Sequence, residues 1–149
     1  MGNKKAIGFS KEQLQGEVYQ CIFQSEAYKR GLLVEKSDVP LPWDFTVTNP
    51  DNIKNPFRVQ VKGTGSLIKR TPTEAGRYHI TAKTGRRKIG GIDPDIIDVC
   101  SFYVEQTCTW YNMPVTALNG SRSVWLYPHV KDSSGTYESW RYDWSIFYT

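Results

Sequence analysis

Hydrophobic and polar residues alternate most regularly in the segment RVQVKG at residues 58–63. The period of two predicts a β-strand with Val59 and Val61 on one face of a sheet. Gln60 and Lys62 then lie together on the opposite face. An edge strand with one solvated face is the simplest explanation of this pattern. The rest of the chain decides whether the carboxamide and the ammonium have a chemical use.

Earlier in the chain, the apolar residues have the spacing of a helix. Apolar residues recur there at intervals of three and four: Leu14, Val18, Cys21 and Ile22. This spacing predicts one amphipathic helix from Lys11 to about Arg30. Ser10 and Gln13 have the spacing of a capping box at its start, and Gly31 is a natural stop after its end.

Short strands are predicted for most of the remaining chain, at residues 32–36, 43–47, 57–62, 78–82, 96–104, 107–112 and 123–127. The apolar, β-branched run at 96–104 is typical of a central strand, and 107–112 is its expected hairpin partner. Residues 115–120 fit a single helical turn. One helix followed by strands and mixed elements predicts an α+β or mixed α/β fold, in one domain over residues 1–149.

Composition narrows the class of protein. The chain has a net charge of +4, five Trp, nine Tyr and six Phe, which is not a disordered composition and permits a polyanionic partner. The three cysteines are far apart and form no C-x-x-C pair, so the pattern does not favour a zinc site. No apolar run approaches the roughly 18 residues that span a bilayer. We expect a cytoplasmic protein of a bacterial or phage-infected cell, with no membrane partner.

The polar face of the 58–63 strand has a use in phosphodiester cleavage, which needs a divalent ion and a cation near the attacking water. Magnesium prefers oxygen ligands. Asp44, on the preceding strand, supplies a carboxylate, Gln60 an amide oxygen, and Val61 a main-chain carbonyl. Lys62 can orient the water. Glu17, on the helix, can reach the same metal site through a metal-bound water or a second metal. We expect Mg²⁺ as cofactor with Mn²⁺ as a substitute.

These residues belong to an ordered set of motifs: GE at 16–17, YKRG at 28–31, WD at 43–44, RVQVK at 58–62, and the strand pair 98–104 and 109–115. The set resembles the PD-(D/E)XK nuclease superfamily. It is similar to the branch with Gln in place of the second acid, which includes cyanobacterial and phage homing endonucleases and Holliday-junction-resolvase-like proteins. The resemblance extends over roughly residues 15–147. Beside Glu17, Gly16 is expected to let the helix approach the sheet closely.

The resemblance implies a restriction-endonuclease-like core, with a mixed β-sheet flanked by helices. It implies magnesium-dependent, site-specific cleavage of double-stranded DNA, with Glu17, Asp44, Gln60 and Lys62 as catalytic residues. Cutting both strands of DNA needs two active sites or one site used twice, so a homodimer or homotetramer is expected. A structure-specific junction resolvase is one alternative. A catalytically inactive DNA-binding relative is another, because Gln60 is a weaker magnesium ligand than an acid.

Basic residues follow the proposed catalytic strand, and we expect six of them to contact DNA, mainly at its phosphates: Lys69, Arg70, Lys83, Arg86, Arg87 and Lys88. The loop with Lys69 and Arg70 can also enter a groove, where arginine can read guanine. A solvated charged face is the plain alternative for such a run. Asp98 is predicted to be a structural hydrogen-bonding acid rather than a ligand, and His79 an ordinary strand histidine. The aromatic residues of the C-terminal segment are expected to pack in the core or at a subunit interface.

Overall fold

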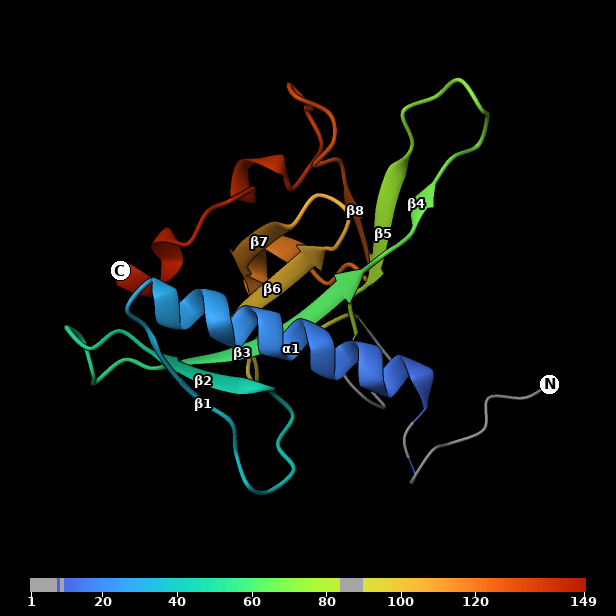
Figure 1. Cartoon of the computed structure of the whole chain (residues 1–149). Helices are drawn as coiled ribbons and strands as arrows, with labels where there is room; N and C mark the ends of the chain where they lie inside the picture. The colour runs from blue at the N-terminus through green and yellow to red at the C-terminus, as the bar shows by residue number, and fades with distance from the viewer. Residues whose placement is uncertain (1–7, 9, 84–89) are drawn as a thin grey trace.

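A single long helix lies across one face of a five-stranded mixed sheet in the computed structural model, which describes residues 8, 10–83 and 90–149 (Figure 1). The sheet has the order β1-β2-β3-β6-β7. Its elements are α1 (Lys11–Lys29), β1 (Leu33–Glu35), β2 (Phe45–Thr48), β3 (Phe57–Thr64), β6 (Val99–Val104) and β7 (Thr109–Pro114). Strands β3 and β6 run parallel, and the other neighbours are antiparallel. The predicted mixed sheet with the helix on one face is confirmed.

A smaller antiparallel sheet covers the other face of the large sheet. Its order is β4-β5-β8, formed by β4 (Leu67–Ile68), β5 (Arg77–Thr81) and β8 (Ser123–Leu126). The connection between β4 and β5 projects from the body of the molecule (Figure 1). Three short 3-10 helices complete the described chain: η1 (Val115–Leu118), η2 (Glu138–Trp140) and η3 (Ser145–Tyr148). The predicted helical turn at 115–120 corresponds to η1, whereas strand β4 was not predicted.

Two apolar cores lie on the two faces of the large sheet. Val59 and Val61 point into the core beneath α1, as the alternation predicts. Phe23 of α1 is fully buried there and stacks on Phe45 with ring centroids 5.6 Å apart. Trp144 and Phe147 of the C-terminal segment belong to the same core, which confirms the expected packing for these two aromatics, whereas Tyr142 and Tyr148 are exposed. The second core lies between the two sheets.

Both ends of α1 follow the sequence signals. The Ser10 hydroxyl accepts a hydrogen bond from the Gln13 main-chain N–H at 3.2 Å, and the Gln13 side chain accepts one from the Ser10 N–H at 2.8 Å. This is the predicted capping box. Gly31 follows the helix with φ +82°, a conformation that costs glycine little. Among the described residues, no helix has the length and apolar character needed to cross a membrane.

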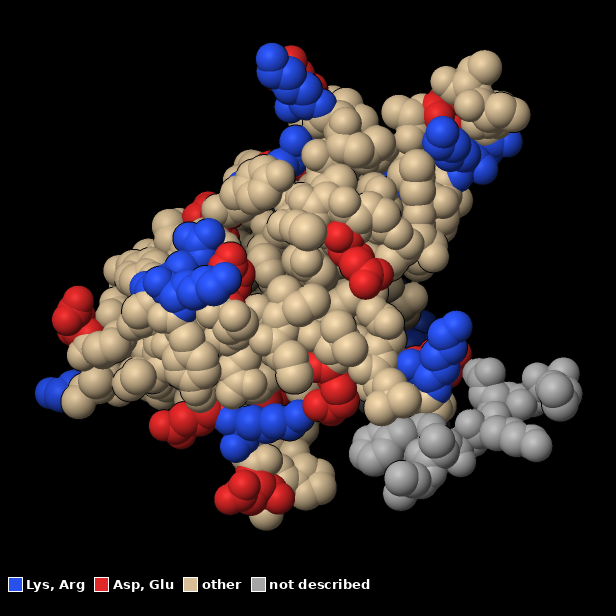
Figure 2. All heavy atoms as spheres, viewed as in Figure 1, with Lys and Arg blue, Asp and Glu red and all other residues tan. Residues whose placement is uncertain are grey.

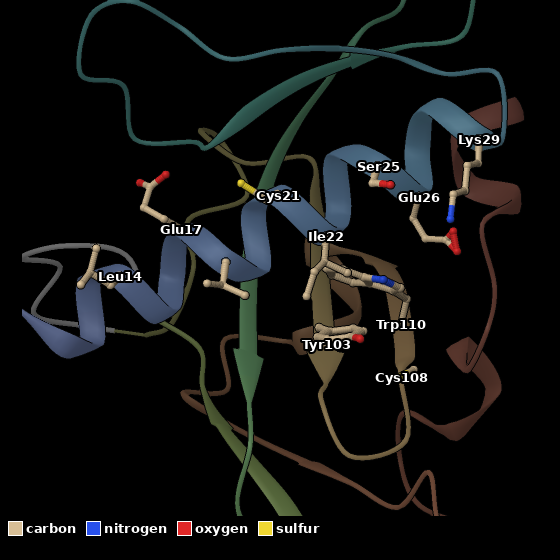
Figure 3. A pocket seen from close by; sticks show the side chains of 11 residues that line it. Leu14, Glu17, Cys21, Ile22, Ser25, Glu26, Lys29, Tyr103, Cys108 and Trp110 are labelled. Carbon is tan, nitrogen blue, oxygen red and sulfur yellow. The ribbon is translucent and has the colours of Figure 1, made fainter.

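The apolar stripe that predicted α1 is not the face that the helix buries. The buried residues of α1 are Tyr19, Phe23 and Ala27, while Leu14 and Val18 are 51% and 46% exposed. Both stripes have helical spacing, so periodicity alone cannot choose between them. The rings of Tyr19 and Phe23 bury more area against the sheet than the aliphatic stripe would. The exposed stripe instead lines a groove of about 610 Å³ beside the β6–β7 hairpin (Figure 3).

Candidate active site

The candidate site lies where β2 stops pairing with β3. The last paired residues are Phe45 and Val59, and the Asp44 N–H donates to the Val59 carbonyl at 2.9 Å. Beyond this point the Val61 N–H donates to the Asp44 carboxylate at 2.8 Å instead of to a strand. The N–H and C=O of one strand residue point to the same edge, so the Val61 carbonyl is directed to the side where Asp44 lies.

The side chains of Gln60 and Lys62 lie on the face opposite the α1 core, as predicted, and both are half-buried. Gln60 Oε1 is a buried acceptor without a hydrogen-bond partner in the described chain. Leaving a buried acceptor unsatisfied costs about 1–3 kcal/mol. Burial lowers the pKa of the Lys62 ammonium, and the nearby Asp44 carboxylate opposes this shift. The site therefore holds two polar groups that the fold alone does not satisfy.

The Asp44 carboxyl has an unfavourable environment for its charge. Burial raises the pKa of Asp44, and the Val61 N–H and then the charge of Lys62 only partly offset this effect. The carboxylate of Glu17 adds to the increase. A further positive charge beside Asp44 would stabilise its ionised form.

Two residues that the sequence analysis missed join Glu17 to this carboxylate. The Gln20 side-chain amide donates to Asp44 Oδ1 at 3.2 Å. Lys36, in the segment after β1, donates to Gln20 Oε1 at 3.0 Å and to Glu17 Oε2 at 2.9 Å. Gln20 lies three residues after Glu17, so both are on one side of α1, and this spacing was an available signal. For Lys36 the sequence offers no comparable signal.

Glu17 is thus brought to the site through Lys36 and Gln20, with 48% of its side chain exposed. It also borders the α1 groove (Figure 3). The predicted role of Gly16 in close packing is wrong, because a Cβ at that position would meet nothing within 4 Å. The close approach occurs at Gly63 of β3, where a Cβ would lie 2.5 Å from Cδ2 of Tyr19.

The donor set determines which ions fit. The described residues contain no group of three or more His, Cys, Asp or Glu side chains that could hold a metal ion. The available ligands are oxygens: the Asp44 carboxylate, the Gln60 amide oxygen and the Val61 carbonyl. Each Asp44 oxygen accepts one hydrogen bond and retains a further lone pair. Together with the unsatisfied Gln60 Oε1, this set fits a hard, oxygen-seeking cation.

A cleft of about 530 Å³ adjoins these residues. It lies between the first half of α1, the end of β3 and strand β5, and its lining includes Glu12, Lys62, Gly63, His79 and Thr81. His79 packs against Trp125 of β8 with ring centroids 4.5 Å apart and ring planes tilted by 40°. His79 therefore packs as a strand residue, and it also borders the cleft that contains Lys62.

The basic residues expected to contact DNA lie in different places. Lys69 and Arg70 are exposed on the β4–β5 connection, where Figure 2 shows basic side chains on the projecting hairpin. Lys83 follows β5, is exposed, and is close enough to contribute to the lowered pKa of Lys62. Three residues of the predicted set lie outside the described residues: Arg86, Arg87 and Lys88.

Asp98 is a structural acid, as predicted. Its carboxylate accepts hydrogen bonds from the Arg58 main-chain N–H at 2.8 Å and from Nε and Nη2 of the Arg58 guanidinium at 3.0 Å each. Burial tends to raise the pKa of Asp98, but the bonds to Arg58 outweigh it and hold the pKa below its usual value. This pair joins the start of β3 to the residue before β6.

Comparisons with known proteins give one informative result. No protein-family model matches the sequence, and no curated protein matches it. Among solved structures, the chain is similar to a bacterial homing endonuclease, I-Ssp6803I, with a TM-score of 0.68 and 22% sequence identity. The match covers 92% of this chain and 93% of the other. The chain therefore shares the overall fold of that nuclease over nearly its whole length.

Proposed function

We propose that this chain is a metal-dependent endonuclease that hydrolyses phosphodiester bonds in double-stranded DNA at specific sites. The observation that carries the proposal is the unsatisfied, buried Gln60 Oε1 in the strand segment that also carries the half-buried Lys62. Between these two residues, the Val61 N–H donates to the desolvated Asp44 carboxylate. If these polar groups had no function, apolar residues of similar size in their place would make the fold more stable. The shared fold with a homing endonuclease supports the same class of reaction.

Each residue has a stated task in this proposal. Asp44, Gln60 and the Val61 carbonyl would hold Mg²⁺, for which Mn²⁺ would substitute. The ion supplies charge stabilisation at the phosphate and lowers the pKa of an attacking water. Lys62 donates hydrogen bonds that orient this water against phosphorus. Glu17 does not contact Asp44 directly in this proposal. It is connected to Asp44 by the hydrogen bonds from Lys36 to Glu17 and Gln20 and from Gln20 to Asp44.

The finer assignment is a homing-type member of the Gln-containing PD-(D/E)XK branch that acts as a homodimer or homotetramer. The order of Glu17, Asp44, Gln60 and Lys62 in the sequence supports the branch. The need to cut two DNA strands supports an assembly with more than one site.

Cleavage assays test the function directly. Supercoiled plasmid, linear genomic fragments and a synthetic four-way junction are incubated with purified protein in Mg²⁺, Mn²⁺ or EDTA. We expect metal-dependent cutting of linear DNA at one or a few sites, lost in Lys62→Ala. Lys54→Ala is the matched control, because Lys54 is exposed in the turn between β2 and β3.

Other outcomes assign other functions. Cutting confined to the junction would replace the homing-type assignment with a resolvase. DNA binding without cutting in either metal would make the chain an inactive DNA-binding relative. Cutting that persists in Lys62→Ala would remove Lys62 from the catalytic set.

A further inference from the structure

The small sheet has one face that the two cores do not use. Tyr78, Ile80 and Leu126 point into the core between the sheets. The strand register places the alternate residues on the opposite side. These residues, all exposed or half-buried, form what we call the outer face: Ile68, Arg77, His79, Thr81, Ser123 and Trp125.

A cluster of three planar side chains lies at the centre of the outer face. The Arg77 guanidinium carbon is 3.6 Å from the ring centroid of Trp125, and the His79 ring centroid is 4.5 Å from that of Trp125. Within the described part of the chain, Arg77 forms no ion pair. Stacking fixes the plane of a guanidinium and leaves its N–H groups available at the edge. Arg77 is therefore a preorganised donor whose charge is not neutralised.

The sign of the surrounding charge favours a polyanion. Four basic residues lie between positions 69 and 83 in the described chain: Lys69, Arg70, Arg77 and Lys83. The acid among them, Glu74, accepts a hydrogen bond from the Arg70 main-chain N–H. A surface of this charge attracts phosphates and gains affinity by releasing their counterions.

The outer face is continuous with the candidate active site. His79 and Thr81 belong to it and also line the cleft that contains Lys62 and Gly63. A polymer that places one phosphate at Lys62 and continues along β5 would meet His79 and then Arg77. A single bound ion would not need this extended path.

We propose that the outer face binds the sugar–phosphate backbone of the DNA duplex beside the scissile bond, with Arg77 as a direct phosphate contact. This inference rests on the proposed function and adds to it a surface for the flanking duplex. The stacked Trp125 holds the Arg77 fork in place. His79 continues the surface to the cleft.

The test measures binding of a fluorescent random-sequence duplex to the full chain by anisotropy, in EDTA, over a series of salt concentrations. We expect Arg77→Gln to weaken binding about tenfold at low salt and to reduce the salt slope by about one. Arg30→Gln is the matched control, because Arg30 also stacks on a tryptophan, with its guanidinium carbon 4.6 Å from the Trp144 ring. We expect this control to bind like wild type. Thermal melts check that both variants fold.

Arg77→Lys separates charge from stacking and is expected to retain most of the salt slope. Equal weakening by Arg77→Lys and Arg77→Gln would overturn a phosphate contact. Equal binding by Arg77→Gln and Arg30→Gln, with wild type binding and cutting DNA, would overturn the inference and leave the proposed function standing. A wild-type protein that neither binds nor cuts DNA would overturn both.

Discussion

Two aspartates flank strand β3, and they have opposite environments. Asp98 accepts a main-chain N–H at the start of the strand and is also held by the guanidinium of Arg58. Asp44 accepts a main-chain N–H further along the strand, and its other oxygen accepts from the neutral amide of Gln20. Both carboxylates thus accept a hydrogen bond from one main-chain N–H of β3. They differ in whether a cation is hydrogen-bonded to them.

This difference has an electrostatic consequence. The pKa of Asp98 is lowered although burial tends to raise it, because the bonds to Arg58 outweigh burial. The pKa of Asp44 is raised by burial, and the N–H of Val61 and the charge of Lys62 do not fully compensate. The charge of Asp98 is matched by a hydrogen-bonded guanidinium, whereas both hydrogen bonds to Asp44 come from neutral groups, which supports the proposed metal ion beside it. The two carboxylates thus differ in their hydrogen-bond partners although both lie beside the same strand.

The largest expected effect is on the cleavage rate, which should fall when Asp44 is replaced but not when Asp98 is replaced. Asp44→Asn removes the charged metal ligand and should lower the cleavage rate about a thousandfold or more, which corresponds to about 4 kcal/mol of transition-state stabilisation. Asp98→Asn should leave the rate of the folded protein within about threefold of wild type, since its carboxylate does not reach the reacting atoms. Plasmid-cleavage kinetics measure both. Equal losses in two folded variants would remove the distinction.

A smaller loss is expected at the neutral partner of Asp44. Gln20→Ala removes the amide that orients the carboxylate and should lower the cleavage rate about 10–100-fold, as loss of a residue behind a metal ligand does. Because the residue acts through Asp44, the half-saturating Mg²⁺ concentration should rise as well. Gln24→Ala, one turn further along α1, is the control and should match wild type. An unchanged metal dependence in Gln20→Ala would contradict the positioning role.

Replacement of Asp98, whose charge is paired with Arg58, should instead affect the stability of the protein and the pH dependence of that stability. Asp98→Asn should lower the free energy of unfolding by about 1–2 kcal/mol at neutral pH, allowing for the partial exposure of the pair. The folded-state pKa of Asp98 is lowered, so its contribution is present above the unfolded pKa and disappears as pH falls through the folded value. Urea unfolding curves of wild type and variant should therefore begin to converge below about pH 4 and become equal only below the lowered folded-state pKa. A constant difference at all pH values would contradict this account.

The smallest expected effect is an increase in stability when Gln60 is replaced. Gln60→Leu removes the unsatisfied acceptor and should raise the free energy of unfolding in EDTA by about 1 kcal/mol. Added Mg²⁺ should stabilise wild type but not the variant. Thermal denaturation with and without metal gives both results. If Gln60→Leu were destabilised in EDTA, Gln60 would have a structural partner and the proposed ligand role would lose its main support.

The parts of the fold that were predicted depend on local signals. The capping box of Ser10 and Gln13 gave the start of α1, and the alternation at 58–63 gave β3 with the correct faces. Asp44 and Gln60 were assigned to one site from their chemistry and the order of the motifs, and the antiparallel pairing of β2 with β3 brings their segments together. Strand β4 has two residues, too few for a periodic signal.

The missed features depend on packing between distant segments. The two apolar stripes of α1 have the same period, and only contact with the sheet selects the one with Tyr19 and Phe23. Lys36 reaches the site from the segment after β1, and Trp125 meets Arg77 across a sheet formed by distant strands. No spacing rule in one sequence encodes such contacts.

Gly63 has a consequence for how this protein tolerates change. Its α-hydrogen faces the ring of Tyr19, so the spacing between helix and sheet depends on one residue having no side chain. Any other residue there would force the Tyr19 ring to move. We expect α1 to shift with this ring and to carry Glu17 and Gln20 away from Asp44. In a random library selected for cutting, position 63 should therefore remain glycine although it carries no functional side chain, and substitutions there should act as remote inactivators.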